Sequence, residues 1–428
     1  MKKGIFALLA AGACLLGVVH AGSALAATPK AVDLTAGLTP RALSACPGLP
    51  EDAVRAAVNR FSADLLAASA EKKEGNLMLS PASVHLALAM TANGAEGSTK
   101  SAMLNLLAGR GVTLDRLNRA NRDWMALLSR TGKKTTLSIA DSIWFDRGYR
   151  PSRLFLKRNA DFYGAAARSL DFRDKNAPGA INAWVKNATR GTIEKIIESI
   201  RRDEVMFLVN AVYFKSDWQV PFEKEQTRKE VFHAPGRDVE VEFMHRTGRM
   251  SFLSGRGATG VALPYDDDGR FEFFALLPDG NATPREWLAR QNRTTLFGDL
   301  AGMMTPKAGL VVQLALPKFE SRYEDTLEDE LASLGMSIAF DPGRADFSGM
   351  SERHTRDLFI GTVRHKTFVR VDEKGTEAAA VTSVGMRMTS LPAIDREISF
   401  DRPFLYGIMD RKAGIPLFVG IMENPAAK

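Results

Sequence analysis

The stretch EKGTEAAAVTSVGMRMTS, residues 373–390, alternates between two kinds of side chain. From Thr376 onward the even positions are small or apolar, whereas the charged Glu377 and Arg387 occupy odd positions. Because side chains alternate between the faces of a strand, this segment would form a strand of roughly 40 Å with one apolar face. Gly375 and three consecutive alanines, however, neither hold a strand alone nor resist movement. The pattern indicates a loop that becomes a strand after some event, with a plain surface loop of small residues as the alternative.

The composition is that of a soluble globular protein, with 428 residues, 45% of them hydrophobic and 25% charged. Residues 1–26 carry two lysines, an apolar run and the small-residue end Ala24-Leu25-Ala26, which predicts a secretory signal peptide. Loss of Lys2 and Lys3 lowers the formal charge from +7 to +5, too small an excess to indicate nucleic-acid binding. We therefore expect an exported protein, periplasmic or extracellular, with no membrane span after signal removal.

The chain has two cysteines, Cys14 and Cys46. Because Cys14 leaves with the signal peptide, the mature chain can form no internal disulfide. Gly12-Ala13-Cys14 is similar to a lipoprotein cleavage site, which stays an alternative, although Ala11 stands where leucine is usual. The six histidines show no spacing typical of a metal site, and no cofactor is expected.

The order of the expected elements indicates the fold class. A polar segment at residues 27–50 precedes a single domain at 51–428. Helical periodicity comes first, at residues 51–70 and again from Pro81, a residue tolerated in the first turn of a helix. Strand patterns follow at residues 137–145, 205–214, 261–277 and 311–319. Helices first and strands mixed in later favour an α+β fold over regular βαβ winding.

Several segments resemble the serpins, a family of protease inhibitors. The serpin hinge pattern Glu-x-Gly-Thr-Glu-Ala-Ala-Ala is matched by Glu373, Gly375, Thr376, Glu377, Ala378, Ala379 and Ala380. Further similarity lies at residues 76–83, 181–193, 208–222, 316–319, 346–350, 400–404 and 416–425. The resemblance implies the serpin fold, with about nine helices around three β-sheets and an exposed reactive-centre loop at about residues 374–396.

The same resemblance implies a function. In inhibitory serpins a protease cleaves the exposed loop and forms an acyl-enzyme, and the freed loop inserts into the main sheet and traps the enzyme. We therefore expect a monomeric suicide-substrate inhibitor, not an enzyme, whose partner is a serine protease, with cysteine proteases as a second class. Counting from Glu373 by family spacing places the cleaved bond between Thr389 and Ser390, with Met388 and Arg387 as alternatives. Thr389 favours elastase-like or subtilisin-like pockets, whereas Arg387 would suit a trypsin-like enzyme.

A second set of residues concerns the opening of the main sheet. By the resemblance, Ser80, Ser83, Asn210 and His365 form the polar cluster beneath the central strands, and Trp218 lies where the loop begins to insert. Buried polar groups need partners, and an exchange of partners can keep two states of a sheet within reach. Local sequence alone would equally allow His365 and Trp218 to be ordinary core residues.

Other functions remain open. A non-inhibitory serpin, a carrier or chaperone, would use the fold without the trap, although small hinge residues argue against it. Ser69-Ala70-Glu71-Lys72 fits the Ser-x-x-Lys spacing of a serine hydrolase, but neither Ser-Asp-Asn nor Lys-Thr-Gly follows. Weak polyanion binding, with a solvated helix face as the alternative, is indicated by Arg110, Arg116, Arg119, Arg122, Arg130, Lys133 and Lys134.

Overall fold

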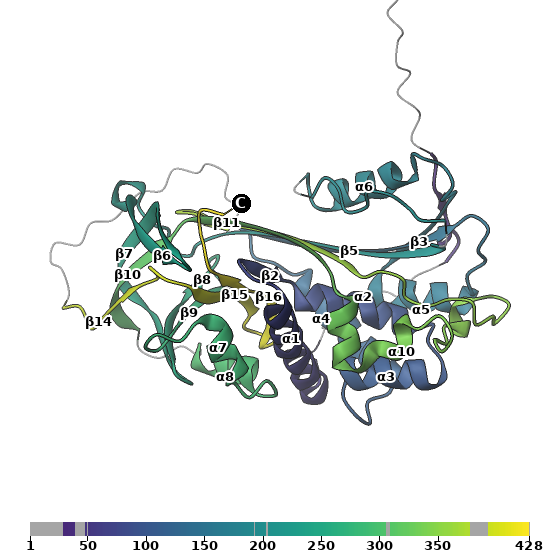
Figure 1. Ribbon diagram of the computed structural model, residues 1–428, viewed down its shortest axis with the longest axis horizontal. Helices are drawn as coiled ribbons and strands as arrows, with labels where there is room; N and C mark the ends of the chain where they lie inside the picture. The colour runs from purple at the N-terminus through teal and green to yellow at the C-terminus, as the bar shows by residue number, and fades with distance from the viewer. Residues whose placement is uncertain are drawn as a thin grey trace, which may run out of the picture.

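The computed structural model describes residues 29–38, 48, 50–191, 193–202, 204–304, 309–376 and 393–427, without the side chains of 138–141, 208, 210 and 211. A long sheet crosses the molecule, with most helices beneath it and α6 above it (Figure 1). The expected signal peptide and both cysteines lie outside the described residues.

Nine helical segments occur among the described residues, as expected. The last of them consists of α9 (Glu328–Leu331) and α10 (Ser337–Phe340), which a π-helical turn at Ala332–Met336 joins. The others are α1 (Asp52–Lys72), α2 (Pro81–Ala92), α3 (Gly97–Leu107), α4 (Leu114–Leu128), α5 (Arg153–Tyr163), α6 (Ala177–Ala188), α7 (Pro284–Ala289) and α8 (Leu296–Met303).

The main sheet has seven strands, in the order β1-β4-β3-β5-β13-β12-β11. Its strands are β1 (Val32–Asp33), β3 (Thr135–Asp146), β4 (Ala166–Leu170), β5 (Met206–Asp217), β11 (Phe319–Thr326), β12 (Arg364–Val371) and β13 (Gly375–Thr376). The two-residue β13 lies between β5 and β12 and is antiparallel to both. The hinge of the expected loop is therefore an interior element of this sheet and, like β1, only two residues long.

Two further sheets share the long strand β7 (Arg237–Gly255), so the expected total of three sheets is confirmed. An edge sheet runs β14-β10-β7-β6, with β6 (Arg228–Ala234), β10 (Leu310–Pro317) and β14 (Arg396–Ser399). A central sheet runs β7-β8-β9-β15-β16-β2, with β2 (Leu77–Leu79), β8 (Ala258–Pro264), β9 (Phe271–Pro278), β15 (Phe404–Asp410) and β16 (Ile415–Met422).

Two hydrophobic clusters lie on opposite faces of the main sheet. The larger joins its inner face to the helices and the central sheet, around residues such as Phe61 and Phe214. The smaller, around Trp144, Ile181 and Phe207, joins the outer face to α6. Among the described residues, no helix combines the length and apolar composition needed to cross a membrane.

Some expected element boundaries were wrong. The strand expected at residues 261–277 is two strands, β8 and β9, because Asp266 and Gly269 adopt positive φ angles in the turn between them. The strand expected at 311–319 is divided at Lys318. The polar segment at 27–50 includes β1, which pairs with β4 at the edge of the main sheet.

Candidate functional site at the hinge of the main sheet

The hinge is inserted between two long strands. Gly375 pairs with Asp217 of β5, and Thr376 pairs with Ser216 of β5 and Val371 of β12. A Cβ atom on Gly375 would overlap the carbonyl oxygen of Ser216, so only glycine allows this close approach. Of the predicted hinge residues, the structure therefore describes Glu373, Gly375 and Thr376. The remaining ones, and the candidate cleavage-site residues, lie outside the described residues: Glu377, Ala378, Ala379, Ala380, Arg387, Met388, Thr389 and Ser390.

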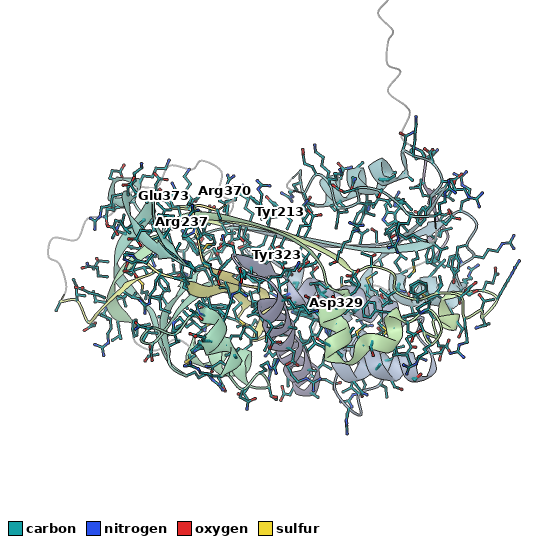
Figure 2. The ribbon with its side chains drawn as sticks, in the orientation of Figure 1. Tyr213, Arg237, Tyr323, Asp329, Arg370 and Glu373 are labelled. Carbon is teal, nitrogen blue, oxygen red and sulfur yellow. The ribbon has the colours of Figure 1, made fainter. Side chains whose placement is uncertain are left out.

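A cluster of Lys318, Glu242, Glu373 and Thr227, called the latch below, holds the chain two residues before β13. Lys318 Nζ lies 3.1 Å from Glu373 Oε1 and 3.0 Å from Glu242 Oε2, and the Thr227 hydroxyl donates to Glu373 Oε1 at 2.9 Å. Burial alone would raise the pKa of Glu373, but the hydrogen bonds it accepts outweigh burial and lower that pKa. Figure 2 shows Glu373 at the end of the main sheet that adjoins the edge sheet. The latch thus fixes where the hinge begins.

Trp218 lies at the hinge rather than with the polar cluster beneath the strands. Its indole Nε1 donates to the carbonyl oxygen of Asp372 at 2.8 Å, and its amide donates to that of Lys374 at 2.7 Å. Its ring stacks on Tyr265, with centroids 4.5 Å apart and planes 8° apart. Trp218 is therefore both a core residue and a direct support of the turn before the hinge.

Three members of the predicted sheet-opening cluster lie together beneath β12. The Ser80 amide donates to His365 Nε2 at 3.0 Å, and the Ser80 hydroxyl donates to the carbonyl oxygen of Leu417 at 2.8 Å. Ser83 and His365 line the same small cavity of about 40 Å³. Burial lowers the pKa of His365 to about 4, so its ring is neutral at physiological pH. Asn210 lies in β5, but its side chain is outside the described part of the structure.

Sequence reasoning missed the partners that the hinge finds through tertiary structure. Tyr265 places its hydroxyl 2.5 Å from Thr376 Oγ1, and Lys318 and Thr227 hold Glu373. No local pattern identifies these residues as partners of the hinge, because each is more than fifty positions from the hinge residue that it contacts.

The residues expected for other functions are engaged elsewhere. Ser69 is fully buried in α1, and Lys72 lies beside Asp329 and Glu330, so the two do not form a nucleophile and its base. Four of the basic residues pair with carboxylates, namely Arg116 with Glu51, Arg119 with Asp115, Arg122 with Asp123 and Lys134 with Asp267. No group of three or more metal-ligating side chains occurs among the described residues.

Comparisons with known proteins agree with this geometry. The family model for "Serpin (serine protease inhibitor)" matches residues 56–425. A serpin-like protein of Thermococcus kodakarensis is 33% identical, over 86% of this chain and 85% of its own. The leukocyte elastase inhibitor of Homo sapiens is 30% identical, over 86% of this chain and 98% of its own.

A solved structure compares closely with the whole fold. The thermophilic serpin tengpin in its native state is 33% identical and has a TM-score of 0.84, covering 92% of this chain and all of its own. The latent state of tengpin gives a TM-score of 0.75, covering 87% of this chain and 98% of its own. Serpins are protease inhibitors that bind target proteases and are generally not enzymes, although some are non-inhibitory. The hinge, the three sheets and these relatives show that the chain belongs to the serpin family.

Proposed function

We propose that this serpin is inhibitory and traps a serine protease by insertion of its cleaved loop into the main sheet. The register of β13 is the observation that carries the proposal. Asn210 lies six residues before Ser216 in β5, and His365 lies six before Val371 in β12. Continued insertion in this register would place Thr382, six residues after Thr376, between Asn210 and His365. The small face of the loop would then pass directly over the polar cluster.

The energy of such an insertion is large enough to distort an enzyme. A central strand pairs its backbone on both edges, and a dozen or more hydrogen bonds at roughly 0.5 to 1.5 kcal/mol each give on the order of 10 kcal/mol. Burial of Val384, Met386 and Met388 would add roughly 1.5 to 3 kcal/mol each. The higher TM-score to the native than to the latent form of tengpin supports a resting state in which this energy is still stored.

The target follows from the cleaved bond. Family spacing from Glu373 favours Thr389–Ser390, with Met388 and Arg387 as alternative primary residues. A threonine suits an elastase-like or subtilisin-like pocket, and a relative named leukocyte elastase inhibitor supports this choice.

The proposed signal peptide at residues 1–26 would export the protein. A monomeric inhibitor would then meet the protease in the periplasm or the medium. Weak polyanion binding by the basic residues between Arg110 and Lys134 would have to compete with the ion pairs that these residues form.

A panel of proteases tests the trap and the bond together. Elastase-type, subtilisin-type and trypsin-type enzymes are each mixed with the mature protein, and products are separated in SDS. We expect a covalent complex with an elastase-type or subtilisin-type enzyme, and a released C-terminal fragment that begins at Ser390. Cleavage without a complex would instead favour the non-inhibitory class of carriers or chaperones.

A further inference from the structure

The Tyr265 hydroxyl occupies a buried position at the hinge. The residue is fully inaccessible to solvent, and its oxygen lies 2.5 Å from Thr376 Oγ1. Thr376, also fully buried, is the first loop residue whose side chain enters the main sheet. Tyr265 follows β8 of the central sheet, so this hydrogen bond joins the hinge to a part of the protein outside the main sheet.

Two stacked rings, those of Trp218 and Tyr265, each hold a different part of the hinge. Trp218 holds the backbone before the hinge, through the carbonyl oxygens of Asp372 and Lys374. Tyr265, stacked on Trp218 and packed edge-on against Phe214, holds the first inserted side chain. Withdrawal of Thr376 would leave the Tyr265 hydroxyl among aromatic rings without this partner. Because buried polar groups are costly to leave unpaired, the bond favours the inserted position of the hinge.

We propose that the Tyr265 hydroxyl is a positioning group that seats Thr376 between β5 and β12 before any protease arrives. When Thr376 is held in this position, two residues of the loop are already inserted. Insertion of the rest of the loop therefore competes better with hydrolysis of the acyl-enzyme. The effect on capture rests on the proposed trapping function. The seat itself belongs to the resting protein and is measured without a protease.

Hydrogen exchange of the resting protein tests the seat. In Tyr265→Phe, the amides of Gly375 and Thr376 should exchange about tenfold faster than in the wild type, because one buried hydrogen bond is lost. Thr376→Val should have the same effect. The double variant should exchange no faster than either single one, since both remove the same bond.

Tyr163→Phe is the matched control. Tyr163 is a buried tyrosine in α5 whose hydroxyl donates to Asn118 Oδ1 at 2.7 Å. Loss of the Tyr163 hydroxyl should lower the melting temperature and leave hydrogen exchange at Gly375 and Thr376 unchanged. If Tyr265→Phe behaves in the same way, Tyr265 is an ordinary core residue and the proposal is overturned.

Inhibition kinetics test the consequence of the seat. With a protease that the wild type captures, Tyr265→Phe should at least double the moles of inhibitor consumed for each mole of protease trapped. Faster exchange with unchanged consumption would overturn the link between the seat and capture. A wild type that captures no protease would refute the proposed function, whereas the exchange measurement would still decide the seat.

Discussion

At the scale of single residues, the hinge combines an unusual backbone approach with a small buried side chain. Gly375 is needed because the chain of β5 lies directly against it, and Thr376 is small enough to be fully buried beside Tyr265. Glu373, by contrast, is anchored through Lys318 and Thr227. The chain is thus anchored at Glu373 and begins its insertion two residues later, at Gly375.

Thr376→Arg should convert the inhibitor into an ordinary substrate. The position has no exposed surface, and an unpaired guanidinium is strongly disfavoured in such a place. Insertion would stall while cleavage continued, so the yield of SDS-stable complex should fall at least tenfold. Thr376→Ser, which keeps a small hydroxyl, should retain nearly full yield. A full yield from the arginine variant would contradict insertion at this point.

His365 should make the stability of the resting form depend on pH. Burial holds its pKa at about 4, against an ordinary value of 6.5, while Asp325 acts weakly in the opposite direction. As the pH falls, the unfolded chain therefore takes up a proton before the folded one. The stabilisation from neutral His365 is complete above about pH 7 and is lost between about pH 6.5 and 4, on the order of 3 kcal/mol.

His365→Asn isolates this contribution, because asparagine keeps an acceptor for the Ser80 amide and does not titrate. Denaturant unfolding from pH 7 to 4 should show the wild type losing about 3 kcal/mol relative to the variant. Ser83→Ala changes the same cluster but no titrating group. Its free energy of unfolding should therefore differ from that of the wild type by the same amount at every pH. If the free energies of unfolding of His365→Asn and the wild type also differ by the same amount at every pH, the His365 ring is not buried as a neutral group.

At the scale of elements, ion pairs on the outer face hold β11 and β12 together as one unit. Arg370 donates to Glu320 at 2.6 Å, and Lys366 donates to Glu324 at 2.7 Å. On the other side of the hinge, β5 pairs with β3 along its length. The main sheet can therefore part between β5 and β12 while both neighbouring pairs stay intact.

Lys318 joins three elements at the point where this parting would begin. It separates β10 from β11, and its ammonium bridges Glu242 of β7 and Glu373 before β13. Lys318→Met should lower the free energy of unfolding by about 1 kcal/mol, since the pair is partly shielded from water. Lys229→Met, which removes an exposed pair with Glu240, should change it by less than about 0.5 kcal/mol. If chemical denaturation shows that Lys318→Met and Lys229→Met lower the free energy of unfolding equally, the latch has no special role in stability.

At the scale of the whole molecule, the proposed function requires a resting state above its energy minimum. Between β5 and β12 the main sheet contains, among the described residues, only the two residues of β13, so a full strand could still be added there if the two long strands part. Insertion after cleavage would complete the sheet. The gain of on the order of 10 kcal/mol should appear as a higher melting temperature of the cleaved protein.

Calorimetry of intact and loop-cleaved protein measures this gain. We expect the cleaved form to melt roughly 10 to 20 °C higher, because a large domain gains roughly 1 to 2 °C for each kcal/mol. Cleavage in the loop of Thr376→Arg should give a much smaller increase. Identical melting temperatures for intact and cleaved wild type would remove the energy source of the trap.

The sequence by itself determined the features that depend on neighbours along the chain. The alternation after Thr376, the helical period before residue 70 and the proline at the start of α2 are local patterns. They indicated an α+β fold, which is confirmed, and an insertable loop, which stays a prediction. The resemblance to serpins, which rests on spacing and residue type, supplied the family and the position of the hinge. Ser80, Ser83 and His365 were placed together on the same basis.

Only the tertiary structure decided which groups receive the hinge. Tyr265 lies 111 positions from Thr376, and Glu373 is 146 positions from Thr227. Such pairs depend on how three sheets pack, because a hydroxyl or an ammonium has no preferred partner until burial removes the competition of water. The turn that divides β8 from β9 was likewise missed, since its apolar flanks read as one continuous strand.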